Sequence, residues 1–182
     1  MYRKIASTIF FLTILFILPL SAADFNLKGI SMYGGIVLPE NWDAGFNAGA
    51  GVSLGELSPG TYLFPSLTYW ETTSEQTDGA DVDLSDFSIA VDVHYFIKHA
   101  QQGLYVGGGL SYNIMSWEYS YLSYPSGSRY WINYNDEKIG FAPVAGYVFN
   151  PGSIAGFAEF KYNLLEDFNT VQISVGLVFG KK

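Results

Sequence analysis

Hydrophobic and polar residues alternate along a stretch near the start of the chain, AGFNAGAGVSLGEL, at residues 44–57. Alternate positions carry Ala, Phe, Val and Leu on one face and Gly, Asn and Ser on the other. Alternation with a period of two is typical of a β-strand that has two unlike faces. A strand in a soluble protein would carry charges on its polar face, whereas this face is merely small. The stretch is therefore predicted to be a strand with an unusual second face.

The same alternation recurs along the rest of the chain, and no segment shows a sustained helical period. The segments predicted as strands are 29–38, 44–57, 61–71, 86–97, 104–114, 138–149, 154–164 and 170–179. Short connections, two of them containing Pro-Gly, alternate with two long links at residues 72–85 and 115–137. The prediction is an all-β chain that forms an eight-stranded antiparallel up-and-down β-barrel, with tight turns at one end and both long links at the other.

The content of the polar face indicates which face points outward. A soluble binding barrel of the lipocalin kind buries its apolar face, and an outer-membrane barrel does the reverse. Gly, Ser, Ala and Asn suit a narrow barrel interior, but they would leave a soluble exterior uncharged and adhesive. Aromatic residues near strand ends, such as Tyr69, Trp70, Tyr95 and Phe96, fit the interfacial girdles of membrane barrels. We therefore predict a transmembrane barrel, with a soluble secreted lipocalin-like barrel as an alternative.

The first 23 residues have the layout of a secretory signal peptide. Arg3 and Lys4 precede an apolar run at residues 9–20, and small residues at 21–23 offer a cleavage site. The domain prediction is therefore a signal peptide at 1–23 and a barrel domain at 24–182, exported through the periplasm to the outer membrane. The alternative is an uncleaved N-terminal membrane anchor.

Composition excludes several classes of function. The formal net charge of −8 argues against nucleic acid as a partner, because such binding depends on neutralising phosphates. The chain has no Cys, which excludes disulfides and thiolate metal sites. Charged residues make up 14% and aromatic residues 18%, which does not suit a disordered chain. No cofactor is predicted.

Four features carry a resemblance to a known family: the signal peptide, the eight amphipathic segments, GFAEFKYN near the seventh segment and the final NTVQISVGLVFGKK. With these features the chain resembles the small outer-membrane β-barrel superfamily that includes OmpA-type and OmpX-type barrels. The resemblance covers the mature chain. It implies a monomeric protein of a Gram-negative outer membrane, surrounded by lipid and assembled by the barrel-assembly machinery. Many members end on an aromatic residue that this machinery reads. Phe179 fits that role, although three residues follow it.

Four titratable residues share the polar faces of two predicted strands: Asp92, His94, Glu159 and Lys161. A basic side chain at mid-membrane on the lipid face costs about 2–4 kcal/mol, so these residues are predicted to face the lumen. They could line an ion path or gate, or they could form a paired plug that satisfies buried charges.

An enzymatic role is not predicted. A lipid-modifying barrel enzyme needs a nucleophile, a base and an orienting acid that face the outer leaflet. The chain has two His residues; His94 is predicted to face the lumen, and His99 falls in a short turn at the opposite end.

The link at 72–85 is acidic, with Glu75, Asp78, Asp81 and Asp83 followed by Asp86. It lacks the Gly and closing Glu of a calcium-binding EF-hand loop. A solvated acidic loop is expected, with a loose cation site as the alternative.

The link at 115–137 is rich in aromatic residues, and their spacing predicts a hairpin that extends past the membrane with its tip at 125–127. Its rings are Trp117, Tyr119, Tyr121, Tyr124, Tyr130, Trp131 and Tyr134. Exposed Tyr and Trp favour binding, so this hairpin is a candidate for contact with an extracellular ligand or surface partner. The alternative is a girdle with a self-packed hairpin.

The predicted function is a non-enzymatic outer-membrane scaffold that displays surface loops for adhesion or partner binding. The alternative is a narrow porin-like channel for small solutes or ions. The lumen of an eight-stranded barrel is usually filled by side chains, which argues against that channel.

Overall fold

The computed structural model describes residues 27–75, 81–98, 101–123, 128–149 and 153–180. These ranges contain nine strands: β1 (Gly29–Pro39), β2 (Gly45–Ser53), β3 (Glu56–Ser58), β4 (Thr61–Glu75), β5 (Asp81–Phe96), β6 (Gly103–Ser123), β7 (Ser128–Phe149), β8 (Ile154–Leu165) and β9 (Phe168–Gly180). The predicted signal peptide, Asp78, His99 and Tyr124 lie outside the described residues. Within these ranges, no helix is long and apolar enough to cross a membrane.

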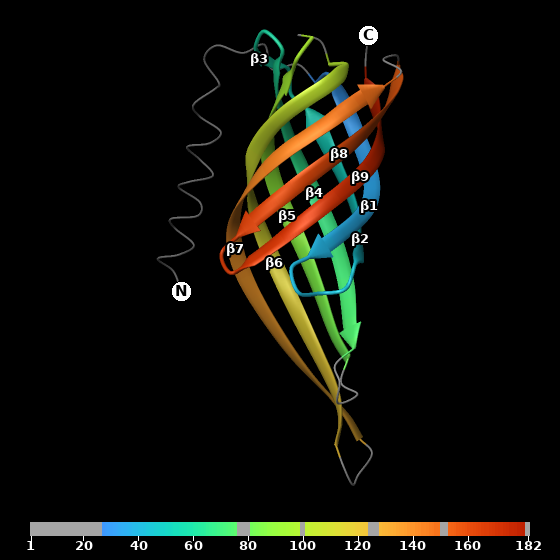
Figure 1. Ribbon diagram of the computed structural model, residues 1–182, viewed down its shortest axis with the longest axis vertical. Helices are drawn as coiled ribbons and strands as arrows, with labels where there is room; N and C mark the ends of the chain where they lie inside the picture. Colours follow the sequence, from blue (N-terminus) through green and yellow to red (C-terminus); the bar gives the residue numbers. More distant parts are fainter. Residues whose placement is uncertain (1–26, 76–80, 99–100, 124–127, 150–152, 181–182) are drawn as a thin grey trace.

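Eight of the strands close into a barrel (Figure 1). The order of neighbours is β2-β1-β9-β8-β7-β6-β5-β4, and a further pairing of β2 with β4 closes the sheet. Every pairing is antiparallel, and β1 begins opposite the end of β9, with Gly29 facing Gly180. The predicted eight-stranded, antiparallel up-and-down barrel is confirmed.

The second predicted strand, residues 44–57, is not continuous. β2 ends at Ser53, and the short β3 pairs only with β4. Between them Gly55 has a φ of 94°, which glycine adopts at little cost and which turns the chain out of the extended conformation. The prediction of one continuous strand was wrong here. Gly55 is one of several glycines in this stretch, so the sequence alone does not mark it as the residue that interrupts the strand.

Turns at the two ends of the barrel use different residues. At the end with short turns, Gly60 and Gly103 have φ values of 79° and 77°. At the other end, Asn41 and Asp167 have φ values of 64° and 60° in the connections that follow β1 and β8. Asn and Asp tolerate this conformation better than other non-glycine residues, so tight reversals form there.

Alternate residues of each strand point outward and inward as the sequence predicts. Phe46 is 76% exposed, whereas the adjacent Asn47 is 5% exposed. Large apolar side chains cover the outside of all eight long strands, in a patch far beyond what soluble proteins expose. Examples from each strand in turn are Met32, Phe46, Leu67, Ile89, Val106, Phe141, Phe160 and Val175. This arrangement suits lipid and is the reverse of a lipocalin-like barrel.

Two of the aromatic residues assigned to the girdles point inward instead. Trp70 and Phe96 are each 1% exposed, while their neighbours Tyr69 and Tyr95 are exposed on the outside. Adjacent residues of a strand lie on opposite faces, so a pair of consecutive rings always divides between the interior and the exterior.

The small interior face makes room for aromatic rings on neighbouring strands. Tyr33 lies opposite Gly49 on one side and Gly176 on the other, and Tyr105 lies opposite Gly146. A Cβ added at Gly49 or Gly146 would meet the tyrosine ring across from it. The glycines of this face are therefore complementary to the rings that fill the interior.

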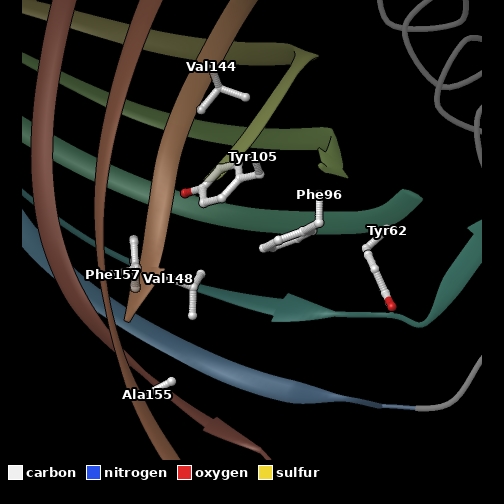
Figure 2. Packing of buried hydrophobic residues seen from close by; sticks show 7 residues of the cluster. All are labelled: Tyr62, Phe96, Tyr105, Val144, Val148, Ala155 and Phe157. Atoms are coloured by element: carbon white, nitrogen blue, oxygen red, sulfur yellow. The ribbon is translucent and has the colours of Figure 1, made fainter. Parts of the chain in front are cut away.

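Buried side chains fill the interior at three successive levels. At the short-turn end lies a largely aromatic cluster, in which Phe96 and Tyr105 point inward (Figure 2). In the middle, polar side chains bond across the lumen; the Tyr33 hydroxyl and Thr68 Oγ1, for example, are 2.7 Å apart. At the far end lies a second apolar cluster, formed by Val37, Trp70, Leu84, Met115 and Leu165.

Four neighbouring strands continue beyond the rim of the barrel (Figure 1). β8 is paired with β7 only as far as Gly140, and β2 is paired with β4 only as far as Glu71. Past these points β4, β5, β6 and β7 remain paired with one another. We call this part, residues 72–75, 81–85, 115–123 and 128–139, the projecting sheet.

The projecting sheet corrects one prediction and confirms another. The segment 72–85 is mostly strand rather than an acidic loop, because β4 and β5 stay paired to Glu75 opposite Asp81. Residues 72–75 are polar on both faces. Val82 and Leu84 are buried and alternate with Asp81, Asp83 and Ser85, but this period-two pattern is short and lies among acidic residues. The predicted hairpin at 115–137 is confirmed for its strands, whereas its tip lies outside the described residues.

Adjacent glycines of β6 test the crowding of the interior. A Cβ at Gly107 would meet the carbonyl oxygen of Val93, whereas a Cβ at Gly108 comes no closer than 3.3 Å to Ala142 O. We expect Gly107→Ala to lower the free energy of unfolding in lipid by about 1–3 kcal/mol, as overpacking does. Gly108→Ala should leave it unchanged or raise it slightly. Equal effects in urea titrations of the two variants would contradict this account.

Candidate functional site

The barrel brings the four predicted lumen residues together. Asp92 and His94 come from β5, and Glu159 and Lys161 come from β8, which lies across the interior. Lys161 Nζ lies 2.7 Å from Asp92 Oδ2, and His94 Nε2 lies 4.0 Å from Glu159 Oε2. We call these four residues the charge cluster. Their side chains are between 6% and 16% exposed, so each interaction is shielded from water.

Aromatic rings hold the imidazole of the charge cluster in place. His94 is stacked between Phe64 and Tyr105, with ring centroids 4.3 Å and 4.6 Å away. The Tyr105 hydroxyl also donates a 2.6 Å hydrogen bond to Glu159 Oε2. The sequence analysis did not select Phe64 or Tyr105. Both lie at inward-facing positions of strands that neighbour β5, which is the signal that could have identified them.

The charge cluster is not fully satisfied. Asp92 Oδ1 and His94 Nε2 are buried and have no hydrogen-bond partner. The ammonium group of Lys161 pairs with Asp92, whereas Glu159 accepts its hydrogen bond from the neutral Tyr105 hydroxyl. A buried polar atom without a partner is unfavourable by about 1–3 kcal/mol, so this cluster has unused capacity to bind.

A cavity of about 330 Å³ lies next to the charge cluster. Lys28, Gln101 and Gly180 line its outer part beside the short turns, so the cavity opens at that end of the barrel. Gln101 Nε2 donates a 2.6 Å hydrogen bond to Ser53 Oγ at this mouth. The inner part is lined by the charge cluster and by aromatic rings.

The acidic residues of the segment that was predicted to be a loop lie on different faces of the sheet. Asp83 points outward and accepts a hydrogen bond of 2.6 Å from Thr73 Oγ1. Asp86 points into the barrel and accepts one of 3.0 Å from Trp70 Nε1. Among the residues that the structure describes, no group of three or more His, Cys, Asp or Glu is placed to hold a metal ion.

The projecting sheet gathers aromatic residues on the face that continues the barrel interior. In the register of β6 and β7, Trp117 lies opposite Tyr134 and Tyr119 lies opposite Ile132. Tyr119, Ile132 and Tyr134 are 43%, 54% and 58% exposed. We call this surface, with Trp117 and Tyr130, the aromatic face.

The structure divides the predicted surface residues. Trp131 is exposed on the opposite face, because it alternates with Tyr130 and Ile132. Tyr121 lies opposite Tyr130 in the strand register, and Tyr124 lies outside the described residues. Trp117 is partly structural, since it packs against the far apolar cluster and lies 5.6 Å from the Tyr134 ring. Ile132 was missed because only aromatic residues were considered.

One edge of the projecting sheet is open. The last pairing of β7 with β8 in this direction joins Gly140 to Leu165. Residues 128–139 of β7 therefore pair with β6 on one side and with no described strand on the other. A strand edge of this kind can bind another extended chain through its main chain.

Phe179 lies near the end of β9, on the lipid-facing side of the barrel. It is 40% exposed and lies opposite Ile30 and Ile154 in the register. Its role as a signal for the assembly machinery stays a prediction.

No protein-family model matches the chain, and no curated protein sequence matches it. Solved structures do share its fold. A crystal structure of Ail, the attachment invasion locus protein of Yersinia pestis, is 18% identical with a TM-score of 0.54, covering 84% of this chain and 96% of that one. A structure of Ail in complex with the heparin analogue sucrose octasulfate has 18% sequence identity and a TM-score of 0.51, and the match covers 84% of this chain and 99% of that one. Neisserial surface protein A has 10% sequence identity and a TM-score of 0.54, and the match covers 84% of this chain and 96% of that one. The fold is therefore that of small outer-membrane β-barrels.

Removing one partner of the Asp92–Lys161 pair should be worse than removing both. Lys161→Met leaves a buried carboxylate without its cation, and we expect a loss of about 3–5 kcal/mol in the free energy of unfolding. In the double variant Asp92→Asn/Lys161→Met, much of this loss should be recovered. Urea-induced unfolding in lipid vesicles would measure the cycle. Additive losses would show that the two residues do not interact.

Proposed function

We propose that the protein is a non-enzymatic, integral outer-membrane barrel that displays the projecting sheet to bind a protein partner or an adhesion target outside the cell. The short turns then face the periplasm, and the projecting sheet faces outward. The apolar exterior supports the membrane position, because lipid is the solvent that matches it.

The observation that carries this proposal is the aromatic face beside an open strand edge. Exposed Tyr and Ile side chains provide contact area, and the edge of β7 can provide main-chain hydrogen bonds to an extended segment. Neither the aromatic face alone nor the open strand edge alone requires a binding role. Their position together on the part of the sheet that extends beyond the barrel favours binding.

The charge of the projecting sheet indicates the class of partner. Asp83, Glu118 and Glu137 are exposed acidic side chains on the face opposite the aromatic face, and the whole chain has a net charge of −8. Ail has been crystallised with a sulfated heparin analogue. A polyanion of that kind would be repelled by these nearby carboxylates and by the net negative charge of the chain, so we propose a protein partner for the present chain.

The interior supports a scaffold rather than a channel or an enzyme. The apolar cluster around Trp70 and Met115 fills the outer end of the lumen, and the charge cluster spans the inner part. His94 is held between two rings near the periplasmic side, away from the outer leaflet.

Adhesion of bacteria that express the protein tests the proposed function. Ile132→Ser/Tyr134→Ser removes two exposed apolar side chains from the aromatic face, and we expect binding to immobilised host-cell proteins to weaken at least about tenfold. The matched control, Asn133→Ser/Asn135→Ser, changes the opposite face of the same strand and should bind like the wild type. If the first variant adheres as well as the second, the aromatic face is not the binding surface.

Planar-bilayer recordings test whether the interior conducts. Because the far apolar cluster around Trp70 and Met115 closes the lumen beyond the cavity, we expect the inserted barrel to show no stable conductance, either as wild type or as Lys161→Ala. A stable conductance that shifts with this substitution would make the charge cluster an ion path and would favour the channel alternative.

A further inference from the structure

We infer that the cavity at the short-turn end binds a small organic cation, a primary ammonium group that carries an apolar or aromatic tail. This site is separate from the projecting sheet, and nothing in the adhesive role requires it. The inference rests on the charge, the unpartnered atoms and the walls of the cavity.

The inner end of the cavity carries an excess of negative charge. Asp92 and Glu159 are balanced by Lys161 alone, and the four members of the charge cluster line the cavity. The 4.0 Å separation between His94 Nε2 and Glu159 Oε2 is too long for a hydrogen bond, so an imidazolium would lie buried without a close partner. With His94 neutral and both carboxyl groups ionised, the net charge of the cluster is about −1, and a cationic ligand would favour this state by compensating the buried negative charge.

The unpartnered atoms match the donors of an ammonium group. Asp92 Oδ1 and the Nε2 atom of a neutral His94 can each accept a hydrogen bond, and neither has a partner in the structure. Both residues are more than nine-tenths buried and line the cavity. An ammonium group has three N–H donors, which match in number these two acceptors and the Glu159 carboxylate. Both acceptor atoms are covered in the structure, so the Asp92 and His94 side chains must shift for the ligand to reach them. Lys161 cannot fill this role, because its own ammonium group is bonded to Asp92 Oδ2.

The walls of the cavity suit an apolar tail. Phe64, Phe96, Tyr105 and Phe157 line it, and the first three belong to a continuous set of ring contacts with His94. Rings near an ammonium group also attract it through their π faces. A volume of about 330 Å³ lies at the lower limit of ligand sites, which points to a ligand with one ring or a short chain.

The mouth of the cavity determines where the ligand enters. The cavity opens beside the short turns, so in the proposed orientation the ligand comes from the periplasm. Lys28 at the mouth is exposed. Its charge is screened by salt over about 8 Å, so it presents a weak barrier to a cation.

Nuclear magnetic resonance of the full barrel in lipid nanodiscs tests the inference with 2-phenylethylammonium as the probe. We expect saturable shifts of residues that line the cavity, such as Ser31, Ser66 and Tyr105. Uncharged 2-phenylethanol should bind at least about tenfold more weakly, and 3-phenylpropionate should not bind. Equal affinity for the alcohol, tighter binding of the carboxylate, or shifts confined to lipid-facing residues such as Ile89 would overturn the inference.

Variants identify the groups that bind. Glu159→Gln keeps the size of the side chain, removes one negative charge, and should weaken binding of the probe at least about tenfold. Ser66→Phe fills part of the cavity without changing the charge cluster and should abolish saturable binding, so it remains informative if Glu159→Gln does not fold. Glu56→Gln, an exposed change at the same end of the barrel, should bind like the wild type. Probe binding that survives both cavity variants would overturn the inference.

Discussion

The pairing of β2 with β4 is the interaction on which the rest of the barrel depends. An apolar exterior can lie in lipid only if every backbone N–H and C=O group of the wall has a partner, and a sheet with free edges cannot meet that condition. Six residue pairs, from Phe46–Glu71 to Gly51–Ser66, form this closure. The interior, the cavity and the projecting sheet all take their positions from a wall that is closed at this seam.

Closure also explains the composition of the interior. Eight strands enclose a narrow lumen, so a ring on one strand needs a glycine across from it. Tyr33 and Tyr105 meet that condition, and the remaining space is shared unequally between the two ends. At the outer end Trp70 and its neighbours pack tightly, whereas at the inner end the rings surround a cavity and leave polar atoms of Asp92 and His94 without partners.

The sequence predicts the barrel and its two faces well, because alternation within one strand is a local property. It does not predict which strands meet across the lumen. Asp92 and Lys161 were expected to face inward, but their direct contact depends on the registers of the three strand pairings that lie between β5 and β8. The continuation of β4 and β5 beyond the rim was missed, because residues 72–75 are polar on both faces and the alternation of Val82 and Leu84 with acidic residues is short. The pairing of this part of β5 with β6 depends on residues far along the chain.

The unequal height of the wall gives the molecule a direction within the membrane plane. β8, β9, β1 and β2 end near the rim, while β4 to β7 continue beyond it on the opposite flank. In the proposed orientation, a rotation of the barrel about its own axis therefore changes which neighbour the open edge of β7 can reach. Rotation of the barrel in the bilayer therefore affects the rate of binding, because a partner fixed in the same membrane can bind only when the open edge of β7 faces it.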